Sequence, residues 1–108
     1  MTKTGRRGKS ADPRPGREVY LFRLFMAGNE TNSAQALVNL VRLCEERVAG
    51  RYKIHTVDVL KNAAVAYANN VIVTPTLILL KPLPTVTVFG NLRDPEQVAA
   101  ALRLTGER

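Results

Sequence analysis

Thiol and imidazole side chains, which carry much of enzyme chemistry, occur only once each in this sequence. Cys44 is the single cysteine and His55 the single histidine among the 108 residues. Dithiol exchange needs two thiols, one of them activated where a helix N-terminus lowers its pKa. We therefore expect neither dithiol exchange nor a histidine-based metal cluster nor a serine–histidine pair in this chain.

The remaining polar side chains show no catalytic spacing either. Cys44 falls on an apolar helical stripe, where a small core residue is the favoured interpretation and a redox sensor is the alternative. His55 is expected on a strand surface. Four carboxylates lack the spacing of a metal or acid–base site: Glu45, Glu46, Asp58 and Asp94. Because the sequence also has no glycine-rich phosphate loop, it predicts no catalytic residue, no bound metal, no cofactor and no enzymatic role.

Length and composition predict a single globular domain. The chain has 108 residues, of which 45% are hydrophobic, enough for one core and too many for a disordered chain. No apolar run approaches the roughly 20 residues of a membrane span, and the first residues lack the apolar segment of a secretory signal. A single cysteine fits a reducing compartment. Together these features predict a cytoplasmic protein without membrane contact.

The positive charge is concentrated near the N-terminus. The net charge is +7, and residues 1–17 hold six basic residues against one acidic residue, a net +5 that leaves +2 for the rest. Glycines and prolines are frequent there, so we predict a disordered basic arm over residues 1–17 and a folded domain over residues 18–108. A solubilising arm is the simplest interpretation, and non-specific contact with nucleic acid or acidic proteins is the alternative. The domain lacks the basic stripe with interleaved aromatics of a specific nucleic-acid site.

Two strands and a helix are expected in the first half of the domain. Residues 19–26 are apolar at both odd and even positions except at Arg23. This pattern is typical of a central strand covered on both faces. Residues 52–59 are rich in β-branched and aromatic side chains and predict a second strand. Between them, Asn32 and Gln35 resemble a capping box and Gly50 resembles a helix stop. The helix is indicated by an apolar stripe at helical spacing: Leu37, Leu40, Val41, Cys44 and Val48.

The second half alternates short elements with turns. Strands are predicted over residues 74–80, led by the apolar residues 71–73, and over residues 85–89 at the sheet edge, joined by a proline-rich turn. A last helix begins with Asp94 as N-cap and Pro95 at its first position, and Gly106 is expected to stop it. A short helix before these strands is predicted from one apolar face, closed by Asn69 and Asn70: Leu60, Ala64, Tyr67 and Val71.

The order of these elements, βαβαββα, is that of an α/β domain of thioredoxin-like layout. A right-handed crossover makes the first two strands parallel, and the short turn makes the last two antiparallel. Pro75 is expected to follow a cis peptide bond at the opening of the third strand. The loop over residues 27–33, where a thioredoxin-like oxidoreductase holds its thiol pair, contains no cysteine. The layout therefore predicts a module that works by binding another protein.

Three stretches of the domain also resemble the motifs of a known protein family. They are residues 24–33 (LFMAGNETNS), 57–62 (VDVLKN) and 74–77 (TPTL). With the spacing between them, they resemble the KaiB family of circadian-clock proteins, and the likeness runs without gaps over about residues 19–104. The resemblance implies a non-catalytic regulator that binds the N-terminal ATPase ring of a KaiC-like hexamer. A thioredoxin-like interaction module for another signalling protein, such as a histidine kinase, is the alternative.

The resemblance further implies two folds and a partner surface. KaiB-like proteins have a tetrameric form with a family-specific fold and a thioredoxin-like, partner-binding form. The two differ in the half of the chain that begins near Leu60, so a homo-oligomer is one expectation. The switched half engages the ATPase ring in such proteins. The resemblance therefore implies a contact at or near six residues, for which a plain amphipathic cover of the sheet is the alternative: Lys61, Asn62, Val65, Tyr67, Asn69 and Asn70.

Several positions depart from the clock-type pattern. Clock members usually carry basic residues where this chain has Gln35, Leu79, Val86 and Thr87, and a proline where it has Ala63. Their acidic C-terminal tail is missing, and a basic N-terminal arm is present instead. These departures indicate a divergent homologue, in a circadian or stress-timing role.

The balance between the two folds is expected to depend on the end of the domain. Clock-type members commonly have glycine and aspartate where this chain has Ala101 and Arg103. Glycine in a helix interior costs about 1 kcal/mol relative to alanine, and arginine suits a helix C-terminus better than aspartate. We therefore predict that the free protein rests in the thioredoxin-like form, with the tetrameric fold as the alternative. The residues expected to matter for this choice are Thr74, Pro75, Thr76, Gly90, Ala101 and Arg103.

Overall fold

Four strands and three helices alternate along residues 18–104, the part of the chain that the computed structural model describes. The strands are β1 (Tyr20–Met26), β2 (Tyr52–Asp58), β3 (Thr76–Lys81) and β4 (Val86–Phe89). The helices are α1 (Thr31–Arg47), α2 (Ala63–Ala68) and α3 (Pro95–Leu102). This order confirms the predicted βαβαββα layout. The basic arm predicted over residues 1–17 lies outside the described residues.

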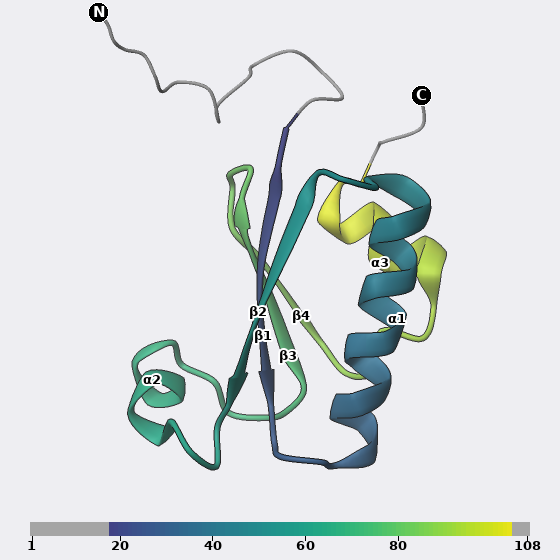
Figure 1. Ribbon diagram of the computed structural model, residues 1–108. Helices are drawn as coiled ribbons and strands as arrows, with labels where there is room; N and C mark the ends of the chain where they lie inside the picture. Colours follow the sequence, from purple (N-terminus) through teal and green to yellow (C-terminus); the bar gives the residue numbers. More distant parts are fainter. Residues whose placement is uncertain (1–17, 105–108) are drawn as a thin grey trace, which may run out of the picture.

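The strands form one mixed sheet in the order β2-β1-β3-β4 (Figure 1). β1 runs parallel to β2 and antiparallel to β3, and β3 runs antiparallel to β4. Both strand pairings predicted from the turn and crossover lengths are therefore confirmed. β1 has a neighbour on each side, whereas β2 and β4 form the edges, as predicted for β4.

One face of the sheet is covered by α1 and α3 (Figure 1). Phe22 and Leu24 of β1, Leu40 of α1 and Leu102 of α3 have no exposed surface in this layer. Cys44 is equally buried in the same cluster, which confirms that it is a core residue. The main hydrophobic core therefore lies between this face and the two helices, and we call it the closed face.

The opposite face is covered by α2 at one end only (Figure 1). A small second cluster forms there: Phe25, Val57, Ala66 and Ile78. The apolar face predicted for this helix is wrong at Ala64, which is exposed, at Leu60, 74% exposed, and at Tyr67, 86% exposed. Only Val71 of that face packs against the cluster, and Ala66 is the buried residue of the helix. A helix of six residues has fewer than two turns, so it meets the sheet through a single small side chain. We call this whole face the open face, and beyond α2 none of the helices within residues 18–104 covers it.

The start of α1 differs from the predicted one. Its N-cap is Glu30, whose carboxylate accepts hydrogen bonds from the backbone N–H groups of Asn32 and Ser33 and from the Ser33 hydroxyl. The capping box predicted at Asn32 and Gln35 is therefore wrong. Ser33 is fully buried, and its need for a hydrogen-bond partner fixes the helix start at Thr31.

The buried stripe and the end of α1 refine the prediction. Val41, expected in the stripe, is 38% exposed, whereas Leu43 is buried. The helix ends at Arg47, with Val48 as C-cap. Gly50 follows with a φ of +77°, a left-handed conformation that favours glycine after a helix.

α3 begins as predicted and ends earlier. The Asp94 carboxylate accepts a hydrogen bond from the backbone N–H of Gln97 at 3.2 Å, and a proline occupies the first turn. The helix ends at Leu102, whereas the predicted stop, Gly106, lies outside the described residues. Arg103 follows with a φ of 57°, in the left-handed region. That conformation terminates the helix before the predicted position.

Candidate partner-binding surface

Exposed apolar side chains gather on α2 and the segments on either side of it. Tyr67 lies on the helix itself, and Ile72, which follows it, is 89% exposed. Exposed apolar patches on a small protein mark interaction sites. Figure 1 shows α2 projecting from one end of the sheet, away from α1 and α3. We call the following set the α2 surface: Leu60, Val65, Tyr67, Ile72 and Val73.

The turn before α2 is held by one carboxylate. Asp58 Oδ1 accepts hydrogen bonds from the backbone N–H groups of Gly28 and Leu60, both at 3.0 Å. The Asp58 carbonyl accepts from the backbone N–H groups of Lys61 and Asn62. Gly28 has a φ of +54°, and a Cβ added there would lie 3.1 Å from Leu60 Cδ1. The two loops at this end of the sheet are therefore fixed against each other, with Leu60 and Lys61 exposed.

The six residues predicted at the partner contact all lie on α2 or next to it. Two of them serve the local fold, because Asn62 Nδ2 donates to the Asp58 carbonyl at 3.1 Å and Asn69 Nδ2 donates to the Val65 carbonyl at 2.8 Å. Asn70 adopts a left-handed φ of 59° as the chain leaves the helix. Solvent-exposed residues of this set include Lys61, Val65, Tyr67 and Asn70.

Thr74, Pro75, Thr76 and Gly90 meet where β3 begins. The Thr74–Pro75 peptide bond is cis, as predicted. The Pro75 carbonyl accepts a hydrogen bond from the Gly90 N–H at 3.0 Å, and the Thr76 hydroxyl donates to the Val73 carbonyl at 2.6 Å. Four of the residues expected to influence the fold are thus brought together, directly after the α2 surface.

Ala101 and Arg103 lie at the other end of the domain and do not join this site. Arg103 Nη2 donates to the carbonyls of Pro82 and Pro84 at 2.8 and 3.1 Å, and the Arg103 carbonyl accepts from the Tyr20 hydroxyl at 3.0 Å. Both prolines follow cis peptide bonds. Arg103 is the C-cap of α3, at the helix C-terminus as expected, and its guanidinium also bonds the β3–β4 turn.

The loop that would hold a thiol pair contains a hydroxyl network. The Ala27 N–H donates to Ser33 Oγ at 3.2 Å, and Ser33 Oγ donates to Glu30 Oε1 at 2.9 Å. The Ser33 side chain and the Asn32 N–H lower the pKa of the Glu30 carboxyl below its usual value. Burial raises the pKa of the Cys44 thiol to about 12, so this thiol stays protonated at neutral pH.

Other reactive groups are sparse within residues 18–104. In this range, no three histidine, cysteine, aspartate or glutamate side chains converge so as to hold a metal ion. His55 lies exposed on β2, as predicted. None of the described helices is long and apolar enough to cross a membrane. The chemistry on offer at the α2 surface is apolar contact and hydrogen bonding.

Sequence reasoning missed three exposed residues near this surface. Residues 71–73 were expected to lead into the third strand, but they pair with no strand, which leaves Ile72 and Val73 exposed. Phe89, 63% exposed, pairs with Thr76 on the edge strand β4. The sequence signal that could have shown Ile72 and Val73 to be exposed was the proline motif at Thr74-Pro75. A chain that turns at Pro75 begins to pair as a strand only after that residue.

Comparison with known proteins identifies the family. The KaiB domain matches residues 23–104, from β1 to the end of α3. The chain belongs to the KaiB family. This confirms the resemblance seen in the three motifs. The circadian clock oscillator protein KaiB of Synechococcus elongatus is 39% identical over 88 residues, which cover 82% of this chain and 86% of that protein. Its namesake from Trichodesmium erythraeum is 37% identical over 93 residues, covering 86% and 89%.

Solved structures similar to this KaiB-family chain share its fold. The N-terminal domain of Synechococcus elongatus SasA superposes with a TM-score of 0.66 at 16% identity, covering 90% of this chain and 95% of that domain. Mitochondrial thioredoxin 3 from Saccharomyces cerevisiae gives a TM-score of 0.62 at 17% identity, covering 82% and 81%. At these identities the likeness concerns the fold alone, and it confirms the thioredoxin-like layout.

Proposed function

We propose that this KaiB-family protein is a non-catalytic regulatory adaptor that binds the N-terminal ATPase ring of a KaiC-like hexamer. The system would be a circadian or stress-timing system of the cytoplasm. The observation that carries the proposal is the α2 surface, an exposed apolar patch on a turn fixed by Asp58. Relatives that are 37–39% identical are named circadian clock oscillator proteins, which supports a clock-type role.

The α2 surface has the composition of a binding site with one dominant side chain. Tyr67 is 86% exposed, so nearly all of its surface is available to a partner. Tyrosine is enriched among the few interface residues that dominate binding energy. Burying a large apolar side chain contributes about 1.5–3 kcal/mol. Lys61, at the rim, is expected to orient the encounter with an acidic partner surface more than to strengthen it.

The proposed role needs neither cofactor nor catalytic group. Cys44 is buried with its pKa raised to about 12, and the loop at residues 27–33 carries no thiol. An adaptor of this kind changes the behaviour of its partner through binding alone. Association of free copies through the α2 surface would compete with that binding, since both would bury the same side chains.

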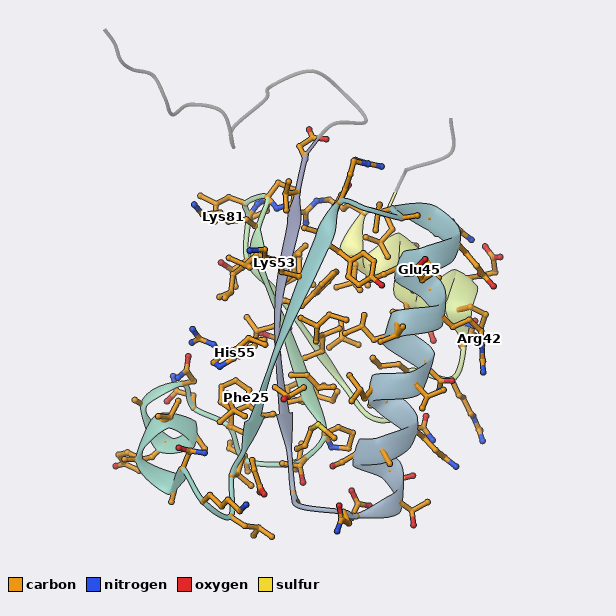
Figure 2. All side chains as sticks on the ribbon, in the orientation of Figure 1. Phe25, Arg42, Glu45, Lys53, His55 and Lys81 are labelled. Carbon is orange, nitrogen blue, oxygen red and sulfur yellow. The ribbon has the colours of Figure 1, made fainter. Side chains whose placement is uncertain are left out.

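Binding to the two-domain KaiC-like ATPase of the same organism tests the proposal. Tyr67→Ala should weaken binding by about tenfold or more, and Lys61→Glu by several-fold. Arg42→Glu is the matched control for Lys61→Glu, since Figure 2 shows Arg42 on α1, on the far side of the sheet from α2. It should change the affinity by less than about twofold. Isothermal titration calorimetry with the isolated N-terminal ATPase ring measures all three.

Three results would overturn the proposal in different ways. Unchanged affinity in both Tyr67→Ala and Lys61→Glu would place the contact outside the α2 surface. Failure of the unmodified protein to bind the ATPase, with binding to a histidine kinase instead, would replace the partner. Sedimentation of the free protein as an oligomer that Tyr67→Ala dissociates would assign the surface to self-association.

A further inference from the structure

The open face carries a cluster of cations in the area that α2 leaves uncovered. Leu21 pairs with Lys53 on one side and Lys81 on the other, and Arg23 pairs with His55. Paired residues share a face of the sheet, as do residues two apart on a strand. The β1–β3 register shifts after Leu21, and such a bulge turns a side chain to the other face. Figure 2 shows Lys53, His55 and Lys81 on the side of the sheet opposite α1.

These four side chains, which we call the basic face (Arg23, Lys53, His55 and Lys81), have no carboxylate partner within residues 18–104. The ion pair found in this range joins Arg47 to Glu96, between α1 and α3. Lys53, His55 and Lys81 are exposed. Arg23 is half-buried among them, and its Nε is shielded from solvent without a hydrogen-bond partner. Buried donors are nearly always paired in native proteins, and this one has no partner among the described residues.

The dimensions of the basic face fit an extended acidic segment better than one small anion. Neighbouring strands lie about 4.8 Å apart, which places the Cα atoms of Lys53 and Lys81, on either side of β1, about 10 Å apart. Arg23 lies two residues after Leu21, so its row of side chains is about 7 Å further along β1. Leu21, between the two lysines, supplies an apolar floor. Single-stranded nucleic acid is less suited, because successive bases stack on several exposed rings, whereas the basic face offers only the His55 ring and Phe25, in the next row, is fully buried.

We propose that the basic face docks an acidic segment of a partner protein, laid across β2, β1 and β3. Arg23, Lys53 and Lys81 repel one another on a surface where residues 18–104 supply no paired carboxylate, and a chain of carboxylates would relieve that repulsion. This surface is separate from the α2 surface, and the inference does not depend on the partner proposed there. It adds a second contact, of a different chemical kind, to the same open face.

Fluorescence anisotropy with a labelled peptide of alternating glutamate and alanine tests the inference on the full-length chain. Lys53→Gln combined with Lys81→Gln should weaken binding by about fivefold or more, since an exposed ion pair contributes up to about 1 kcal/mol. Arg42→Gln combined with Arg93→Gln removes two exposed cations outside the basic face. That control should weaken binding by less than about twofold, although the net charge falls equally. Amide NMR shifts on peptide addition should centre on residues 21–23, 53–55 and 80–81.

Five outcomes would overturn the inference. Equal weakening by the two double variants would show that binding follows net charge, as contact with the basic N-terminal residues would. Unchanged binding in the Lys53 and Lys81 double variant, or shifts centred on α2, would place the peptide elsewhere. If Lys53→Gln alone weakened peptide binding and Lys81→Gln did not, the peptide would lie along the β2 edge. Tighter binding of a uridine oligonucleotide of equal charge, with the same amide shifts, would assign the face to RNA.

Discussion

The two faces of the sheet differ in what covers them, and the difference separates folding from recognition. On the closed face, two helices withdraw Phe22, Leu24 and Leu40 from solvent completely. On the open face, α2 contributes only Ala66 to its cluster and leaves the α2 surface and the basic face exposed. Apolar burial is the main stabilising term in folding, so stability is concentrated on one side. Substitutions on the open side can therefore alter binding while the fold persists.

The largest expected difference distinguishes two leucines. Leu40 has no exposed surface, whereas Leu60 is 74% exposed. Leu40→Ala should lower the free energy of unfolding by about 2–5 kcal/mol, because it leaves a cavity in the closed layer. Leu60→Ala should change it by less than about 0.5 kcal/mol. Urea denaturation followed by circular dichroism measures both, and comparable losses in the two variants would contradict the division between faces.

A smaller effect is expected where α3 is tied to the β3–β4 turn. Ala101→Gly costs about 1 kcal/mol of helix stability, and Arg103→Asp removes the hydrogen bonds to the Pro82 and Pro84 carbonyls, a loss of about 1 kcal/mol or more. Together they should destabilise the thioredoxin-like form by about 2 kcal/mol. Because alternative folds of one sequence differ by only a few kcal/mol, NMR shifts over residues 95–102 should lose helical character in the double variant.

Ala101→Gly alone is the control for that experiment. Ala101 is exposed, and Ala101→Gly leaves the Arg103 hydrogen bonds intact. The single variant should therefore show about half of the destabilisation of the double variant. The unmodified free protein should give helical shifts over residues 95–102. Strand-like shifts over residues 99–104 in the unmodified protein would contradict the predicted resting fold. If the double variant were no less stable than the single one, the Arg103 hydrogen bonds would not stabilise the thioredoxin-like form.

The smallest effect concerns pH and the closed face. Burial raises the pKa of Cys44 from 9.0 to about 12. Because the folded pKa is the higher one, the thiol's contribution to stability is complete below about pH 8 and is lost as the pH rises towards 12. The free energy of unfolding should fall by about 1 kcal/mol between about pH 8 and about pH 9.5. Cys44→Ala should flatten this slope.

Tyr52 sets the background for the pH experiment. Its hydrogen bond to Glu45 raises the Tyr52 pKa to about 12, and the bond persists in the Cys44→Ala variant. A residual slope above about pH 10, the usual tyrosine value, is therefore expected in both proteins. An identical slope below that pH in the two proteins would show that the Cys44 thiol does not titrate on unfolding.

The fold was predictable where patterns are long or chemically explicit. The two-sided apolar run of β1, the Asp94 cap with its following proline, and the cis bond before Pro75 all appear in the structure. Prediction failed at α2, because six residues are too few to display a helical period. It also failed at the end of α3, because Arg103 ends the helix in a left-handed conformation that is usually taken by glycine and contacts Pro82 and Pro84 across the domain.

The candidate site was predictable only in part. The VDVLKN stretch directed the prediction to the segment around α2, where Lys61 and Tyr67 are exposed. Ile72 and Val73 were hidden, since an apolar run before a strand is normally assigned to that strand. The basic face left no sequence signal at all. Its members are isolated basic residues on three strands, and only the β2-β1-β3 register makes them neighbours.

The hydrogen bond from the Tyr20 hydroxyl to the Arg103 carbonyl joins the first strand to the end of the last helix. The chain therefore enters and leaves the described domain at one end of the sheet, and Figure 1 shows α2 at the other end. An affinity tag or tether that extends from residue 18 or from residue 104 would start on the side away from α2. A sensor chip coated with this protein through either end would thus present the α2 surface outward, towards the flowing partner.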